Sequence, residues 1–302
     1  MIQPLKIGMI GLDTSHAAAF TKLLNDPETP FHVEGGRVTV AFKGGSPDFD
    51  KSLSRIERFT AAVRDEYGVK LVDRIEDVAE LSDAILLTSV DGRVHLEQFS
   101  RIASYGKPIF IDKPFAVTSA DAIEIVALAR KYHVPLMSSS SLRYTEDLVQ
   151  ALAVDDSYGD IYGADCYGYV ELQPTQPGLF WYGVHCAEML YAILGRGCVE
   201  VHAVTNENHE HVVGVWNDGR VGTIRGQRAG PRSNGALIHG TKGTRFIDCS
   251  LHPKPKYASL LERVMLLFQT GKPPIDIEDT LEIIRFLEAA NESRATGKPV
   301  KL

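Results

Sequence analysis

Residues 6–16, which read KIGMIGLDTSH, decide the fold of the first half of the chain. Lys6–Ile10 is a short apolar run typical of a buried strand, and Ala17–Leu24 has the pattern of a helix. Gly11 stands between them, where the chain must turn. A strand, a glycine turn and a helix in this order form the first part of a dinucleotide-binding unit, whose turn has the fingerprint GxGxxG.

Only the first glycine of that fingerprint is present. Asp13 holds the place of the second glycine, and His16 holds that of the third. In one interpretation Asp13 caps the helix by accepting hydrogen bonds from the amides of Ser15 or His16, although a carboxylate about 4 Å from a phosphate costs roughly 1 kcal/mol in water. In another, the hydroxyls of Thr14 and Ser15 hold the phosphates while Asp13 points away or binds a ribose. A helix cap without any ligand is the third interpretation.

Strand and helix patterns alternate as far as about residue 138. The strand patterns cover residues 6–10, 37–42, 69–72, 83–88, 108–111 and 135–138, and the helical patterns cover residues 17–24, 52–67, 75–81, 94–105 and 120–132. Strand and helix patterns that alternate with only short connections between them predict βαβ units, which build a parallel sheet with helices on both faces. We therefore expect an α/β fold whose N-terminal domain, residues 1–144, is a doubly wound Rossmann sheet that binds a dinucleotide.

The pattern changes after about residue 145. Helical patterns cover residues 145–152, 181–194, 259–269 and 277–296, and strand patterns cover residues 159–172, 199–206, 211–216, 220–227, 235–239 and 244–248. Consecutive strands with turns such as NDGR and GTKG predict a mostly antiparallel sheet. We expect residues 145–302 to form an α+β domain for substrate binding and oligomerisation. Its few helices leave one sheet face uncovered, which predicts a homo-oligomer, a dimer or tetramer.

The composition excludes several classes of protein. The 302 residues are 44% hydrophobic and 24% charged, which is ordinary for a globular protein and excludes a disordered or fibrous chain. The net charge is −7 without a basic run, so we expect neither nucleic acid nor a membrane surface as a partner. The start of the sequence has no signal-peptide pattern, and four scattered cysteines are typical of reduced core residues. We expect a cytoplasmic protein.

Polar residues follow several of the predicted parallel strands, at the edge where such sheets bind ligands. After the second strand, the acid that usually binds the ribose 2′-hydroxyl is missing. Lys43 and Ser46 stand there instead, and they either receive a 2′-phosphate, which favours NADP, or belong to an ordinary loop. The candidate cofactor-binding residues, for NAD or NADP, are Gly11, Leu12, Asp13, Thr14, Ser15, His16, Lys43, Ser46, Thr88, Ser89, Asp112 and Lys113.

Five segments together resemble the glucose–fructose oxidoreductase, inositol dehydrogenase and MocA (Gfo/Idh/MocA) family. They are KIGMIGLDTSH at the start, LLTSVDGRVH, IDKPFA, the GVH turn at residues 183–185, and the tail EDTLEIIRFLEAANESRATGKPV. They span nearly the whole chain in the family's order. The resemblance implies a nicotinamide-dependent oxidoreductase that moves a hydride between the cofactor and a carbinol carbon of a sugar, polyol or related carbohydrate.

The resemblance also implies which residues are catalytic. The family's EKP lysine matches Lys113, and the histidine of its DxGxH motif matches His185, whereas Trp181 replaces the aspartate of that motif. Lysine and histidine would bind the reacting hydroxyl, and an imidazole is suited to carry its proton at neutral pH. The candidate substrate-binding residues are Arg143, Tyr144, Trp181, Tyr182 and His185.

Two other functions remain open on the same fold. One is a redox-neutral carbohydrate lyase or epimerase, and the other is a sensor without catalysis; Asp13 and Trp181 favour these alternatives. We expect no metal, although His185 and Glu188 lie three residues apart on one helix and would form a site with His202, His209 or His211.

Overall fold

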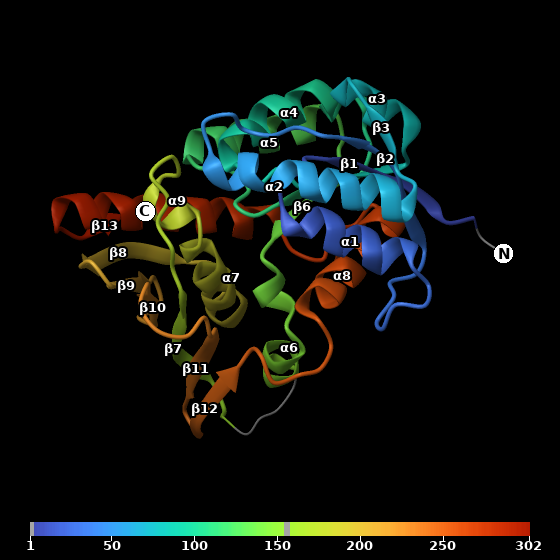
Figure 1. Ribbon diagram of the computed structural model, residues 1–302. Coiled ribbons are helices and arrows are strands. Elements are labelled where there is room, and N and C mark those ends of the chain that lie inside the picture. Colours follow the sequence, from blue (N-terminus) through green and yellow to red (C-terminus); the bar gives the residue numbers. More distant parts are fainter. Residues whose placement is uncertain (1–2, 154–157) are drawn as a thin grey trace. The chain divides into compact units, whose positions relative to one another are not determined.

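The structure, a computed structural model, describes residues 3–153 and 158–302. The chain forms two compact units that alternate along the sequence (Figure 1). The first comprises Met1–Ala116, Ala120–Ser139 and Tyr257–Ile277, and the second comprises Val117–Ser119, Ser140–Lys256 and Glu278–Leu302. Residues 257–277 therefore belong to the first unit, whereas the sequence analysis places them in a second domain that begins at residue 145.

The first unit contains the expected doubly wound parallel sheet. Its strand order is β3-β2-β1-β4-β5-β6, and all its pairings are parallel. The strands are β1 (Leu5–Ile10), β2 (Gly36–Phe42), β3 (Lys70–Val72), β4 (Ala84–Leu87), β5 (Ile109–Asp112) and β6 (Leu136–Ser139). The order reverses between β1 and β4, and a ligand of such a sheet binds at the carboxyl ends of the strands at this switch point.

Helices cover both faces of this sheet. In Figure 1, α1 and α2 lie together on one face, and α3, α4 and α5 lie on the other. The helices are α1 (Ser15–Asn25), α2 (Asp50–Ala61), α3 (Ile75–Leu81), α4 (His95–Ile102), α5 (Ser119–Lys131) and, from the returning segment, α8 (Lys256–Thr270). The sequence predicts one helix over residues 52–67, but the α-helix ends at Ala61 and continues as a π-helix, Ala62–Glu66.

The central strands are buried on both faces. Every residue of β4 and β5 is buried, as are Ile7, Met9 and Ile10 of β1. This explains why these strands appear in the sequence as continuous apolar runs and not as an alternating pattern.

The second unit is built on a seven-stranded sheet of order β12-β11-β7-β10-β9-β8-β13. The strands are β7 (Ile161–Tyr169), β8 (Cys198–Thr205), β9 (His209–Trp216), β10 (Val221–Gln227), β11 (Gly235–Gly240), β12 (Gly243–Asp248) and β13 (Val300–Lys301). The predicted mostly antiparallel sheet is confirmed, with one parallel pair, β7 and β10. The sequence analysis missed β13, which pairs with β8.

One face of this sheet carries helices α7 (Gly183–Leu194) and α9 (Ile277–Thr296). Packing of α7 against β7 and β10 and ring contacts of Tyr191 with Trp216 and Phe286 form the core. The short helix α6 (Glu146–Leu152) packs near β12. Residues on the other face include Val221, which is 43% exposed, and Phe246, which is 61% exposed.

Asn25 connects α1 to β2 in the first unit and provides a test of this packing. Its side-chain amide donates to Val38 O and accepts from Val38 N–H, both at 2.8 Å, and both groups are buried. Asn25→Ala leaves a buried carbonyl and a buried amide without these partners. We expect the free energy of unfolding to fall by about 1–3 kcal/mol, measured by urea titration. The exposed Lys22→Ala on the same helix should stay within about 0.5 kcal/mol of wild type; equal effects would contradict this role of Asn25.

Candidate functional site

The β1–α1 turn begins at Gly11 in a backbone conformation that favours glycine. Its φ is 91°, and an added Cβ would lie 2.3 Å from the backbone nitrogen of Ser89. The helix cap is Thr14, whose Oγ1 accepts from His16 N–H at 3.3 Å. The interpretation in which Asp13 caps the helix is therefore wrong, because Asp13 points away from the helix amides.

Asp13 is fully buried and bonds to helix α2 and to the loop after β4. Its Oδ2 accepts from the hydroxyl of Ser52 at 2.7 Å, and its Oδ1 accepts from the amide of Val90 at 3.0 Å. Ser52 Oγ in turn accepts from Ser46 N–H at 2.9 Å. Burial raises the pKa of Asp13, and the hydrogen bonds partly offset this rise. Asp13 thus connects the loops that follow β1, β2 and β4.

The two candidates after β2 lie in different surroundings. Lys43 is partly exposed, and its ammonium pairs with the Glu57 carboxylate of α2 at 2.5 Å. Ser46 is only 3% exposed and uses its amide to bond Ser52. The Glu57 carboxylate therefore already balances the charge of Lys43, which the sequence analysis offers to the 2′-phosphate of NADP.

Thr88 and Ser89, the candidate cofactor-binding residues after β4, hold neighbouring segments in place. Thr88 Oγ1 donates to the carbonyl of Gly11 at 2.7 Å, and Ser89 Oγ donates to Gln98 Oε1 on α4 at 2.8 Å. Leu12 is completely buried, whereas Ser15, in the first turn of α1, is exposed. The turn therefore offers solvent mainly the N-terminal end of α1.

Asp112 and Lys113 stand where β5 ends, and both are buried. Asp112 Oδ2 hydrogen-bonds His16 Nδ1, so the residue in the place of the third glycine connects α1 to β5. Burial raises the pKa of Asp112, but His16 and Lys113 outweigh it and hold this pKa below its ordinary value. Burial lowers the pKa of Lys113; the nearby charge of Arg55 adds to this effect, and that of Asp112 opposes it.

Two of these groups escaped the sequence analysis. Ser52 and Arg55 lie three residues apart on α2, hence on neighbouring positions of one helix face. The segment reads as an ordinary amphipathic helix, and nothing local marks either residue as part of the strand-end cluster.

In the second unit, His185 lies in the first turn of α7. Its Nδ1 is 2.7 Å from Ser140 Oγ, and this hydroxyl also accepts from Leu142 N–H at 3.1 Å. The ring of Tyr182 meets the imidazole edge-on, with centroids 5.5 Å apart. His185 is half-buried and held by a hydroxyl on one side and an aromatic ring on another.

The aromatic candidates form a chain of ring contacts. Trp181 is only 2% exposed and packs edge-on against Tyr182 at 5.5 Å, and Tyr182 packs edge-on against Tyr169 at 6.0 Å. The indole of Trp181 is thus buried at the position where the family motif has an acid.

Arg143 belongs to an ion-pair network. Its guanidinium lies 3.2 Å from Glu188 Oε2 on α7 and 3.5 Å from Asp279 Oδ2 on α9. Glu188 is buried against this arginine. Tyr144 lies half-buried in the same 3₁₀ turn, Ser141–Tyr144.

The structure has neither a metal-type cluster nor a membrane-spanning helix within residues 3–153 and 158–302. No three His, Cys, Asp or Glu side chains gather there closely enough to hold an ion, and no helix is long and apolar enough to cross a bilayer. Three of the four cysteines are buried, and all four are free.

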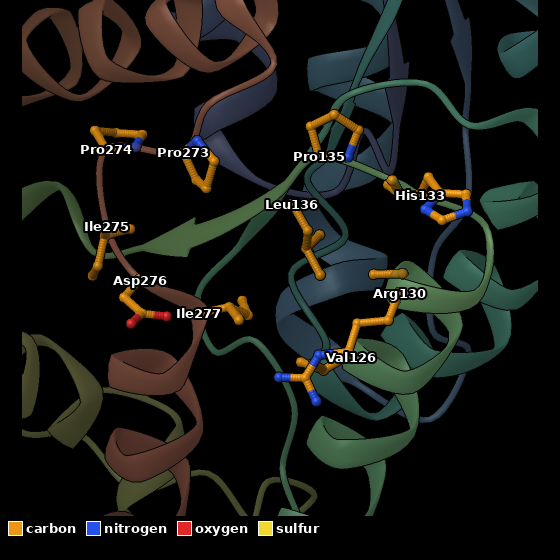
Figure 2. A pocket seen from close by; sticks show the side chains of 12 residues that line it. Val126, Arg130, His133, Pro135, Leu136, Pro273, Pro274, Ile275, Asp276 and Ile277 are labelled. Carbon is orange, nitrogen blue, oxygen red and sulfur yellow. The ribbon is translucent and has the colours of Figure 1, made fainter.

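A cavity of about 630 Å³ in the first unit lies away from this cluster. Figure 2 shows it between the end of α5 and the segment at residues 273–277. Pro135 and Leu136, at the amino end of β6, line it together with Arg130 and Asp276. It lies at the opposite end of the strands from Asp13 and Lys113 and includes no candidate residue.

Comparison with known proteins identifies the first unit. Residues 5–140 match the family described as GFO_IDH_MocA, an oxidoreductase family with an NAD-binding Rossmann fold. These residues belong to the Gfo/Idh/MocA oxidoreductase family. The cofactor of this family is NAD. No curated protein matches the chain.

Solved structures share the fold over nearly the whole chain. GenD2 from gentamicin A biosynthesis, solved in complex with NAD, has a TM-score of 0.80 at 17% identity and covers 100% of this chain and 97% of its own. A probable dehydrogenase from Thermotoga maritima has a TM-score of 0.80 at 18% identity, covering 98% and 99%. The myo-inositol 2-dehydrogenase from Lactobacillus plantarum has a TM-score of 0.79 at 16% identity, covering 99% and 100%. Identities this low show the fold alone.

The residues at the β1–α1 turn fit a dinucleotide of this family. Gly11 brings the turn close to the switch point between β1 and β4, and α1 begins there with Ser15 exposed. The amides of a helix N-terminus favour a pyrophosphate. The glycine fingerprint is degenerate, but the element that binds phosphate is present.

Asp112 gives a test of the strand-end cluster. Because its folded-state pKa is depressed, the carboxylate contributes stability that is present above its ordinary pKa of about 3.9 and is lost as the pH falls through the folded value. We expect Asp112→Asn to lower the free energy of unfolding by about 1–3 kcal/mol at pH 7. The difference from wild type should shrink below pH 4 in urea titrations.

The exposed Asp73→Asn serves as the control and should show no such pH-dependent difference. A constant deficit of Asp112→Asn from pH 3 to pH 7 would show that the charge of Asp112 is not what stabilises the cluster.

Proposed function

We propose that the protein is an NAD(P)-dependent dehydrogenase that transfers a hydride between the nicotinamide and a carbinol carbon of a sugar, polyol or related carbohydrate. The observation that carries this proposal is the buried Lys113 at the end of β5, on the ligand-binding edge of an NAD-binding family fold. Fold neighbours that include inositol dehydrogenases support the substrate class.

The environment of Lys113 suits a group that anchors a hydroxyl. Its burial removes competing water, and Asp112 provides a nearby negative charge. His16 fixes Asp112 in turn. A fixed ammonium with little solvent around it binds a substrate oxygen more strongly than a solvated one, because the local dielectric is low.

We propose His185 as the group that takes up the proton. In the proposed reaction Nδ1–H donates to Ser140 Oγ, so that Nε2 accepts the proton of the substrate hydroxyl. Ser140 Oγ lies 2.7 Å from Nδ1 and belongs to the same unit as His185.

The chemistry needs both groups. The nicotinamide, when bound, supplies the carbon that accepts or returns the hydride. Lys113 holds the hydroxyl oxygen, and His185 removes its proton, since the hydride leaves only as the O–H bond gives up its proton. Tyr182 limits the rotation of the imidazole through its edge-on contact.

Lys113→Ala and His185→Gln test the two roles with a polyol substrate panel. We expect Lys113→Ala to lose roughly 10²-fold or more in kcat while its Tm stays within a few degrees. The rate of wild-type oxidation should rise with pH as the imidazole of His185, the proposed base, loses its proton, and His185→Gln should flatten this profile. NAD affinity of His185→Gln should stay near wild type.

Two matched controls accompany these variants. Lys70→Ala and His133→Gln replace exposed residues of the same kinds and should retain full activity and the wild-type profile. A folded Lys113→Ala with full activity, or an unchanged pH profile in His185→Gln, contradicts the assignment.

We further propose that the protein forms a homo-oligomer, a dimer or tetramer, through the face of the second unit's sheet that lies opposite α7 and α9. Val204, Val221 and Phe246 are between 43% and 62% exposed on its strands. Exposed apolar side chains on a broad sheet favour a self-complementary contact.

Light scattering at micromolar concentration tests the oligomer. We expect a mass at least twice that of the 33.2 kDa chain, and a shift towards the monomer in Val221→Glu, because a charge would be buried in the contact. A wild-type monomer under these conditions overturns this proposal and leaves the proposed chemistry unaffected.

A further inference from the structure

We infer that Asp13 makes the protein select NAD over NADP by placing a buried negative charge beside the loop that follows β2. This inference rests on the proposed function, because it concerns the cofactor that the dehydrogenase uses. The acid that usually discriminates the two cofactors stands at the end of β2, and this chain has Phe42 and Lys43 there.

Asp13 reaches the β2–α2 loop through a chain of hydrogen bonds. Ser46 N–H donates to Ser52 Oγ at 2.9 Å, and the Ser52 hydroxyl donates to Asp13 Oδ2 at 2.7 Å. A Cβ on Gly44 would lie 3.2 Å from Gly11 Cα, so the loop packs directly on the turn that carries Asp13. The carboxylate therefore belongs spatially to the end of β2, although its residue follows β1.

Both carboxylate oxygens of Asp13 accept hydrogen bonds, from Ser52 and from Val90. Acceptance at both oxygens fits an ionised group, since an ionised carboxylate only accepts. The charge is surrounded by protein and not by water, because Asp13 has no exposed surface. Its field is therefore weakly screened and acts over several ångströms without contact with the ligand.

The cations of these loops are already paired with acids. Lys43 pairs with Glu57 at 2.5 Å. Arg93, which follows β4, pairs with Asp48 at 2.8 Å and with Asp91 at 2.7 Å. Lys43 and Arg93 are thus paired with three acids, and Asp13 is a fourth acid in the same region.

Arg55 is a third cation of this region, because it lies three residues after Ser52 on one face of α2, and its charge also acts on Lys113. Lys43, Arg93 and Arg55 thus stand against four acids, Glu57, Asp48, Asp91 and Asp13. A 2′-phosphate brings close to two negative charges into a region with excess acid, whereas the 2′-hydroxyl of NAD brings none. The pairing of Lys43 thus argues against the NADP interpretation of that residue.

Calorimetric titration of the full-length protein with NAD and NADP tests the inference without relying on turnover. We expect the wild type to bind NAD at least about tenfold more tightly than NADP. Asp13→Asn keeps the shape and an acceptor of the side chain but removes its charge. This variant should reduce the ratio of the Kd for NADP to the Kd for NAD by about tenfold, mainly by lowering the Kd for NADP. Asp13→Ser is a second neutral variant with the same expectation.

Two controls separate charge from other causes. Asp73→Asn changes the net charge equally at an exposed site and should leave the ratio unchanged. Lys43→Ala should also leave it within about twofold, since that ammonium is paired with Glu57. Melting curves establish that each variant is folded.

The outcomes distinguish this inference from the proposed function. If the folded wild type binds neither cofactor, both fail. If it binds NADP as tightly as NAD, or if the neutral Asp13 variants keep the wild-type ratio, the inference fails while the proposed dehydrogenase stands. A large loss of NADP binding in Lys43→Ala also overturns it, because Lys43 would then be the residue that recognises the phosphate.

Discussion

The burial of the Asp13 carboxylate is the constraint on which the loops of the first unit depend. An ionised group in the protein interior must find donors, or its desolvation costs several kcal/mol. Asp13 finds them in Ser52, in the first turn of α2, and in Val90, in the loop after β4. The loops after β1, β2 and β4 therefore adopt their conformations together. Asp112 repeats the arrangement one strand further along, where His16 and Lys113 balance its charge.

Much of the fold could be predicted because its determinants are local. The continuous apolar runs of β4 and β5 and the alternation of strand and helix patterns identify a parallel sheet, and helix α3 has the bounds that its sequence pattern predicts. Short edge strands lack such a signal. Two residues, Val300 and Lys301, form β13 only because β8 offers an unpaired edge.

The candidate site was harder to predict because its contacts are distant in sequence. A carboxylate close to the start of a helix is a common cap, and nothing local shows that Asp13 instead bonds Ser52, 39 residues away. Resemblance to a family locates Lys113 and His185 but not what supports them. The hydroxyl of Ser140 against His185 and the pairing of Arg143 with Glu188 depend on how helix α7 packs. Where the family has an acid, Trp181 and Tyr182 give the imidazole an aromatic environment.

The alternation of the two units along the chain has a consequence for how the protein folds during synthesis. The first unit is complete only when Tyr257–Ile277 has been made, and the second only when Glu278–Leu302 has followed. Strand β7 pairs with β10 and β11, so it waits for about 70 further residues before its partners exist. Nascent chains that leave the ribosome therefore expose unpaired strand edges, which are prone to aggregate. No contiguous fragment consists of either unit alone, so neither can be obtained by simple truncation.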